Sequence, residues 1–281
     1  MSLDILSIKY TDHAADKQFE HSIKHSGFAV INDHPIESDL IDEVYEDWKN
    51  YFSSEEKTKY MFDEVKQDGY FPLGSENAKG YKTKDLKEFY HIYPWGRFPN
   101  ELSGATIDLY NKMVDVTSNL LGWIEANSPS EIRTKFHIPL KSMIIDSKTN
   151  LLRVIHYPPL DGTEQPDAVR AAAHEDINLI TLLVAGTQAG LQVQDTSSKW
   201  HEVSCDPGSL VINAGDMLHE VSGGYFPSTT HRVINPGDTI KNESRYSMPL
   251  FLHPRDDVVL SKHYTAREYL DERLFEIGLR S

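Results

Sequence analysis

Three adjacent residues that bind metals or protons, His174, Glu175 and Asp176, stand directly before an apolar run. On an extended strand, side chains at i and i+2 project from the same face, so His174 and Asp176 can converge while Glu175 points away. An imidazole and a carboxylate are ligands for a divalent metal ion, and a second histidine would make the set suitable for iron. The spacing therefore indicates part of a metal site that residues elsewhere must complete.

The third ligand has to come from the later part of the chain. Histidines available there are His201, His219, His231 and His253. His231 is favoured because it begins the strand-like run THRVINP, shortly after a turn rich in Gly, Ser and Pro. Two histidines and one carboxylate on one face of an octahedron leave three open positions, enough for a bidentate cosubstrate and dioxygen.

A second pair with chemical potential is Arg245 and Ser247, again two residues apart on a predicted strand. A guanidinium grips a carboxylate through two parallel hydrogen bonds, and a hydroxyl can add a third. The pair follows His231 by a short connection, so hairpin-like adjacency predicts that it lies deep in the same barrel. It would suit the far end of a dicarboxylate; the alternative is a surface arginine beside an ordinary strand serine.

Most of the strands that would position these residues are predicted in the second half of the chain. Short β-rich runs separated by turn residues follow residue 150, and their close spacing favours a sandwich or barrel. These runs are LLRVIHY, NLITLLVAG, GLQVQDT, KWHEVSC, GSLVINAGD, THRVINP and RYSMPLFLH. A closing helix is predicted over 266–279.

The first half is predicted to be mainly helical. Helical segments are expected at 14–26, 36–52 and 107–124, and short strands at 5–10 and 28–33. Residues 63–100 are rich in Gly, Pro and aromatic side chains, which predicts an irregular segment. Such a segment either wraps on the core or lines a pocket.

Composition narrows the partners and the compartment. The 281 residues carry 28 basic and 43 acidic side chains, a net charge of −15 that disfavours nucleic acid and anionic membrane surfaces. The one cysteine, Cys205, excludes an intramolecular disulfide and is interpreted as a small residue packed near a strand. With no signal-peptide pattern and no apolar run of membrane-spanning length, the sequence predicts a soluble cytoplasmic protein.

Several motifs, in order, resemble the isopenicillin N synthase-like branch of the iron(II)/2-oxoglutarate-dependent oxygenases. In the core these are HEDINLITLL, GDMLHEVSGGYFPSTTHRV and RYSMPLFLHP. In the first half, GFAVINDHPI and YFSSEEKTKY are similar to the leading segment of that family. The 54 residues between Asp176 and His231 are a separation typical of the branch. The resemblance extends over nearly the whole chain.

The resemblance implies a mainly β fold with flanking helices. Its core would be a double-stranded β-helix, or jelly roll, preceded by a helical N-terminal region. We expect the N-terminal support region at 1–148, the jelly-roll core at 149–256 and a C-terminal helix at 257–281. The three parts would form one compact unit.

The resemblance also implies roles for individual residues. The implied iron ligands are His174, Asp176 and His231, and the implied contacts of the C5 carboxylate of 2-oxoglutarate are Arg245, Ser247 and Tyr157. The match at Tyr157 is looser, because relatives often carry Asn two residues earlier, where this chain has Ile155. Candidate substrate contacts are Arg170, Tyr81 and His219, each with an ordinary loop, packing or second-sphere role as its alternative.

The implied reaction is oxidation of an unactivated C–H bond of a small molecule, with release of succinate and carbon dioxide. Hydroxylation, desaturation and cyclisation all stay open as outcomes. The implied requirements are iron(II), 2-oxoglutarate and dioxygen, with ascorbate as a candidate reductant. No partner other than a small-molecule substrate is indicated, and the oligomeric state stays open.

Three other functions are consistent with parts of the pattern. Same-fold iron oxidases and cyclases use an Arg-x-Ser pair on their own substrates and dispense with 2-oxoglutarate. A non-catalytic jelly-roll binding module would keep the fold but would not need the joint set of His174, Asp176, His231 and Arg245. A zinc hydrolase is disfavoured because the sequence has no His-Glu-x-x-His motif.

Overall fold

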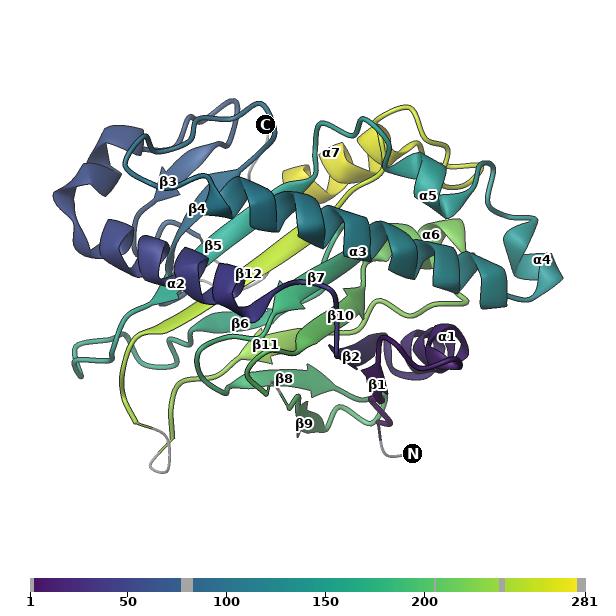
Figure 1. Ribbon diagram of the computed structural model, residues 1–281, viewed down its shortest axis with the longest axis horizontal. Helices are drawn as coiled ribbons and strands as arrows, with labels where there is room; N and C mark the ends of the chain where they lie inside the picture. Colours follow the sequence, from purple (N-terminus) through teal and green to yellow (C-terminus); the bar gives the residue numbers. More distant parts are fainter. Residues whose placement is uncertain (1–2, 77–82, 205, 238–240, 277–281) are drawn as a thin grey trace.

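The computed structural model describes residues 3–76, 83–204, 206–237 and 241–276. Their strands form two sheets, one of eight strands and one of four, with helices along one side (Figure 1). The expected double-stranded β-helix with flanking helices is confirmed. The apolar residues on the facing sides of the two sheets, among them Val193, Val211 and Val233, form one buried cluster that fills the barrel.

The eight-stranded sheet brings together strands from both halves of the chain. Its order is β1 (Ser7–Lys9), β2 (Phe28–Asn32), β10 (Leu210–Ala214), β7 (Ile180–Val184), β12 (Arg245–Leu252), β5 (Leu151–Tyr157), β4 (Glu88–Ile92) and β3 (Gly69–Phe71). All neighbours are antiparallel except β1 and β2, which are parallel. Four of the eight strands therefore come from the first half of the chain. β1 and β2 coincide with the short strands predicted at 5–10 and 28–33, whereas β3 and β4 were not predicted.

The four-stranded sheet is built only from the second half. Its order is β6 (Ala171–His174), β11 (His231–Val233), β8 (Leu191–Gln194) and β9 (Trp200–Glu202). In the antiparallel pairing of β6 with β11, His174 and His231 are directly opposite each other. Directly opposed residues on neighbouring strands have side chains close enough to interact, so this register brings the two histidines together.

Alternation along β12 separates the barrel interior from the helical layer. Met248 and Leu250 are fully buried in the cluster that the helices cover. Phe251 lies instead on the cavity side, and Arg245 and Ser247 share its side because side chains at i and i+2 of a strand point the same way. The same strand therefore supplies both a wall of the hydrophobic core and a wall of the barrel interior.

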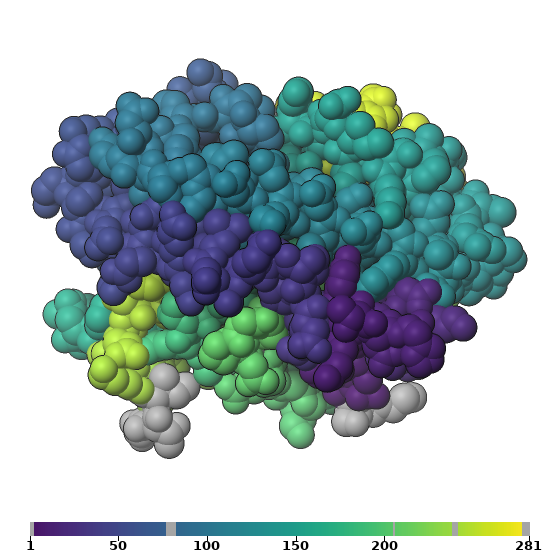
Figure 2. Space-filling model, viewed as in Figure 1, coloured from purple at the N-terminus to yellow at the C-terminus, as the bar shows by residue number. Residues whose placement is uncertain are grey.

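The helices are α1 (Ala15–Ser26), α2 (Ser38–Ser53), η1 (Glu55–Tyr60), α3 (Ala105–Asn127), α4 (Ser130–Arg133), α5 (Leu140–Met143), α6 (Asp216–Val221) and α7 (Ala266–Glu276). Of these, α1, α2 and α3 pack against strands of the large sheet, and α7 lines the cavity described for the site. Leu109, Met113 and Leu120 of α3 are fully buried at helical spacing. Figure 2 shows side chains of α2 and α3 closing over the sheet on this side.

Two predicted arrangements differ from the structure. Residues 63–100 are not irregular throughout, because β3 and β4 within them extend the large sheet. Their pairing partners lie far away in sequence, which periodicity alone does not reveal. The hairpin predicted between the His231 and Arg245 strands is also wrong, since β11 and β12 belong to different sheets.

Among the described residues, no helix combines the length and the apolar character needed to cross a membrane.

Candidate metal centre

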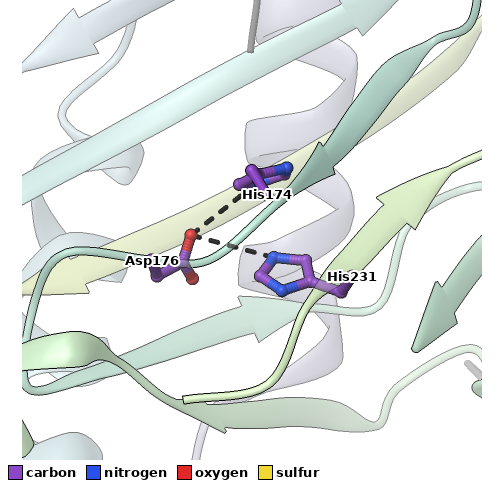
Figure 3. Close-up of side chains that lie close together, drawn as sticks. All are labelled: His174, Asp176 and His231. Carbon is purple, nitrogen blue, oxygen red and sulfur yellow. Dashed lines mark ion pairs between the residues drawn. The ribbon is translucent and has the colours of Figure 1, made fainter. Parts of the chain in front are cut away.

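The two histidines and the aspartate that were predicted to bind metal converge in the structure (Figure 3). Their ligand atoms all lie within 4.8 Å of one another. The Nε2 atoms of His174 and His231 are each 3.7 Å from Oδ1 of Asp176. The arrangement is that of a two-histidine, one-carboxylate face, which suits a divalent transition metal such as iron(II).

Hydrogen bonds on the far side of each ring fix which nitrogen faces the centre. Nδ1 of His174 donates to the carbonyl of Ala172 over 2.8 Å, and Nδ1 of His231 donates to the carbonyl of Thr229 over 3.1 Å. Each ring therefore presents a lone pair at Nε2, as a metal ligand requires. Phe28 packs edge-on against the His231 ring at 5.5 Å between centroids and helps to hold it.

Asp176 is oriented in the same way. Its Oδ2 accepts hydrogen bonds from Thr181 Oγ1 at 2.6 Å and from Asn213 Nδ2 at 2.8 Å. These donors occupy one carboxylate oxygen and leave Oδ1 facing the histidines. Asn178 supports the arrangement by donating to Thr181 Oγ1 at 2.9 Å. Each of the three candidate ligands thus has one free atom that can bind a metal ion, and its other polar atom is hydrogen-bonded to the protein.

The electrostatics of the centre favour metal-binding protonation states. Burial, together with the neighbouring His231, lowers the pKa of His174 to about 4. Burial by itself would raise the pKa of Asp176, but the two imidazoles and its hydrogen-bond donors outweigh it and lower that pKa. A neutral imidazole and an ionised carboxylate are the forms that bind a metal ion.

The convergence does not arise in the way that was predicted. β6 ends at His174, and Asp176 lies in the irregular segment that follows instead of on the same strand. Asp176 still lies close to the two histidines because the backbone after β6 is hydrogen-bonded to the turn between β10 and α6. There the amide of Asp216 donates to the carbonyl of Asp176 over 2.7 Å.

The predicted 2-oxoglutarate contacts lie at the start of β12 and at the end of β5, which pairs with it. Tyr157 and Arg245 are directly paired between β5 and β12, and the Arg245 guanidinium carbon is 5.1 Å from the centre of the tyrosine ring. Arg245 is 1% exposed; its Nε donates to the carbonyl of Gln188 over 3.0 Å. One of its terminal nitrogens, Nη1, has no hydrogen-bond partner. Ser247 is likewise buried.

The three candidate substrate contacts have different locations. Arg170 is fully buried directly before β6, near Arg245, and is not an exposed loop residue. His219 lies on α6, where its ring bonds the carbonyl of Phe226, and it is not among the described residues that line the cavity beside the candidate ligands. Tyr81 lies outside the described residues, as does Cys205.

A cavity of about 1160 Å³ opens beside the candidate ligands. Its walls combine aromatic side chains with charged ones. They include Phe62, Phe71, Phe89, Trp95, Lys87, Arg153, His174, Asp176 and His253. Phe62, Phe71 and Phe89 stack with ring centres 4.3 and 4.6 Å apart, which gives one wall a flat apolar surface. A cavity of this size and mixed lining suits a small organic molecule.

Comparison with known proteins fits this geometry. Residues 148–254 match the 2OG-Fe(II) oxygenase superfamily, and residues 3–113 match the non-haem dioxygenase in morphine synthesis N-terminal family. A Shewanella oneidensis protein described as an oxygenase is 48% identical, with 99% of each chain covered and a TM-score of 0.89. The chain belongs to the 2OG-Fe(II) oxygenase superfamily. It is therefore a non-haem iron(II)/2-oxoglutarate-dependent dioxygenase by family, as the motifs predicted.

More distant superfamily members are similar over most of the chain. A 2OG-Fe(II) oxygenase family protein from Caulobacter crescentus is 30% identical, covering 99% of this chain and all of its own, with a TM-score of 0.80. A flavonol synthase/flavanone 3-hydroxylase from Eustoma exaltatum subsp. russellianum is 26% identical over 250 residues, 82% of this chain and 69% of the relative. The superfamily acts on small molecules.

The residues present fit the two groups that the superfamily requires. The three converging ligand atoms are a donor set for iron(II). The unpaired N–H of Arg245 is a buried donor that lacks an acceptor, and a carboxylate would supply one.

Sequence reasoning missed an ionic network in the cavity wall. Nζ of Lys87 is 2.8 Å from Asp85 and 2.9 Å from Glu76, and Arg153 pairs with Glu76 at 3.1 Å. Arg153 Nε also donates to Nε2 of His91 over 2.8 Å. The network depends on the pairing of β4 with β5, which joins residues 62 positions apart. The alternation of Lys87, Phe89 and His91 was the one local signal available.

Proposed function

We propose that this protein is an iron(II)- and 2-oxoglutarate-dependent oxygenase that oxidises an unactivated C–H bond of a small molecule held in the cavity. The main supporting observation is that His174 Nε2, His231 Nε2 and Asp176 Oδ1 converge. The other polar atom of each side chain is hydrogen-bonded to the protein. These three side chains would hold the iron. Arg245, Ser247 and Tyr157 would hold the C5 carboxylate of 2-oxoglutarate.

When bound, iron(II) and 2-oxoglutarate together convert dioxygen and the substrate into oxidised product, succinate and carbon dioxide. The contribution of the chain is to position and to exclude water. Thr181 and Asn213 keep the carboxylate of Asp176 turned toward the histidines. Phe71, Phe89 and Phe251 keep the adjacent wall apolar, which favours a substrate with an apolar portion near the centre.

The test combines metal binding with product analysis. Wild-type protein reconstituted with iron(II) under anaerobic conditions should develop a weak visible charge-transfer band on addition of 2-oxoglutarate. In air it should release succinate in the presence of a substrate. His174→Ala and Asp176→Ala should abolish the band and the succinate, and His219→Ala, outside the cavity, is the matched control.

Two outcomes would contradict the proposal. Full succinate release by His174→Ala or Asp176→Ala would show that the metal site is elsewhere. Iron binding with no response to 2-oxoglutarate, together with oxygen-dependent product, would identify the same-fold oxidase or cyclase instead.

A further inference from the structure

The base of the barrel holds a second buried arginine beside Arg245. Arg170 directly precedes β6 and is four residues before His174, about 13 Å along an extended chain. Arg170 and Arg245 are each 1% exposed. Their guanidinium carbons are 6.0 and 5.1 Å from the same ring, that of Tyr157. Two cationic groups, one on β12 and one directly before β6, therefore meet at one buried aromatic side chain.

The hydrogen-bond partners of both arginines are neutral. Arg170 donates to Gln188 Oε1 at 3.3 Å and to the carbonyl of Glu243 at 2.9 Å. Arg245 donates to the carbonyl of Gln188 at 3.0 Å. Nε of Arg170 and Nη1 of Arg245 have no partner. Among the described residues, no carboxylate lies within ion-pair distance of either guanidinium, so two buried positive charges stand without a counter-charge.

Such a pair is costly unless an anion completes it. Removing a charge from water is unfavourable when no opposite charge is near, and a like charge beside it adds to that cost. Burial, followed by the positive charge of Arg245, lowers the pKa of Arg170. An anion bound between the two guanidinium groups would relieve this repulsion.

The glycine at position 186 leaves space for the Arg245 side chain. A Cβ on Gly186 would lie 2.7 Å from Nη2 of Arg245 and 3.0 Å from its guanidinium carbon. The absence of a side chain at position 186 therefore lets the guanidinium lie where it does. The neighbouring Gln188 contacts both arginines, one through its side chain and one through its carbonyl, and couples their positions.

We propose that Arg170 acts with Arg245 as a two-arginine site that selects a 2-oxo acid with a second carboxylate. This inference rests on the proposed function, in which Arg245 holds the far carboxylate of 2-oxoglutarate. Arg170 is then a specificity-determining residue for the cosubstrate and not a contact of the primary substrate. The alternative is that Arg170 only ties the loop at Gln188 to the loop at Glu243.

The experiment compares two 2-oxo acids of the same length. 2-Oxoglutarate and 2-oxopentanoate chelate iron through the same end, but only the first has a second carboxylate. Each is titrated into the anaerobic iron(II) protein, and its dissociation constant is read from the visible charge-transfer band. Arg170→Gln should weaken 2-oxoglutarate about ten- to hundred-fold, as expected for loss of a charge-assisted hydrogen bond. Binding of 2-oxopentanoate should be unchanged.

Further variants separate recognition from folding. Arg170→Lys keeps the charge and should recover part of the preference for 2-oxoglutarate. Arg245→Gln should retain a measurable preference, because Arg170 would still supply a positive charge beside Tyr157. Arg232→Gln is the matched control, since Arg232 also pairs with a glutamine, Gln192, and stacks on Trp200 away from the barrel base; its preference should equal that of wild type.

Two results would overturn the inference. One is a weakening of both 2-oxo acids by the same factor in Arg170→Gln, which is the signature of a purely structural tie. The other is complete loss of the preference in Arg245→Gln while Arg170 is intact. If wild-type protein binds iron(II) but gives no band with either acid, the proposed function itself fails, and the inference fails with it.

Discussion

At the scale of single residues, each candidate ligand has two polar side-chain atoms, and a hydrogen bond to the protein occupies one of them. The carbonyls of Ala172 and Thr229 take Nδ1 of the two histidines, and Thr181 and Asn213 take Oδ2 of Asp176. The remaining atoms, Nε2 of each histidine and Oδ1 of Asp176, face one another. Groups that orient ligands in this way are expected to contribute strongly to metal affinity although they never touch the metal.

Thr181→Val tests this directly. Valine keeps the branched shape of the buried threonine but removes the hydroxyl that donates to Asp176. We expect the affinity for iron(II), measured by anaerobic titration, to fall about 10- to 100-fold with little change in secondary structure. Thr181→Ser retains the hydroxyl and should bind metal nearly as well as wild type. Equal affinity in all three proteins would show that the carboxylate needs no such support.

At the scale of elements, the turn between β10 and α6 places the aspartate. The amide of Gly215 donates to the carbonyl of Leu179 over 2.9 Å, and the next amide donates to the carbonyl of Asp176. A Cβ on Gly215 would lie 2.3 Å from the carbonyl oxygen of Asn178 and 2.8 Å from that of Asp176. Only glycine allows the two backbone segments to approach so closely.

Gly215→Ala should therefore displace the segment that carries Asp176. We expect a lower melting temperature and weaker iron(II) binding, because backbone atoms have to move to accept the methyl group. Gly104→Ala is the control: Gly104 has φ −68°, and a methyl group on its Cα would meet nothing within 4 Å. Thermal unfolding and metal titration of both variants give the comparison. Wild-type metal affinity in Gly215→Ala would contradict the assigned role of this turn.

At the scale of the whole molecule, ion pairs with a buried carboxylate connect separate segments of the chain. Asp68 is 1% exposed and pairs with Arg97 at 3.0 Å. Burial by itself raises the pKa of Asp68, but the hydrogen bonds and charge of Arg97 outweigh it and lower the pKa below the ordinary value. Such a carboxyl stabilises the fold above its unfolded pKa of about 3.9, and the stabilisation is lost as pH falls through the folded pKa.

Asp68→Asn should lower the free energy of unfolding at pH 7 by about 2 kcal/mol, the range for hydrogen bonds to charged groups. The difference from wild type should shrink below roughly pH 4, where the native carboxyl becomes protonated. Denaturant unfolding at several pH values measures it. Asp257→Asn, in an exposed pair with Arg255, should change stability by less than about 1 kcal/mol. A difference that stays constant with pH would contradict this assignment.

The sequence by itself determined the residue types that can bind a metal ion and the local periodicity of the helices and strands. The run LLRVIHY coincides with β5 from Leu151 to Tyr157, and helical spacing located α2 and α3 to within a few residues. These features depend on residues a few positions apart, so a single sequence contains them. The set of two histidines and one aspartate could be chosen because few residue types bind iron. His231 was favoured by the strand-like run that it begins, and the family resemblance implied the same residue.

Only the tertiary structure decided which distant segments meet. Pairing of β4 with β5, and the assignment of β11 and β12 to different sheets, join residues separated by tens of positions. The same long-range packing carries Asp176 back to the histidines from outside its strand and gathers Arg170 beside Arg245. Such contacts are decided by the burial of whole faces and the closure of the barrel, which no short stretch of sequence determines.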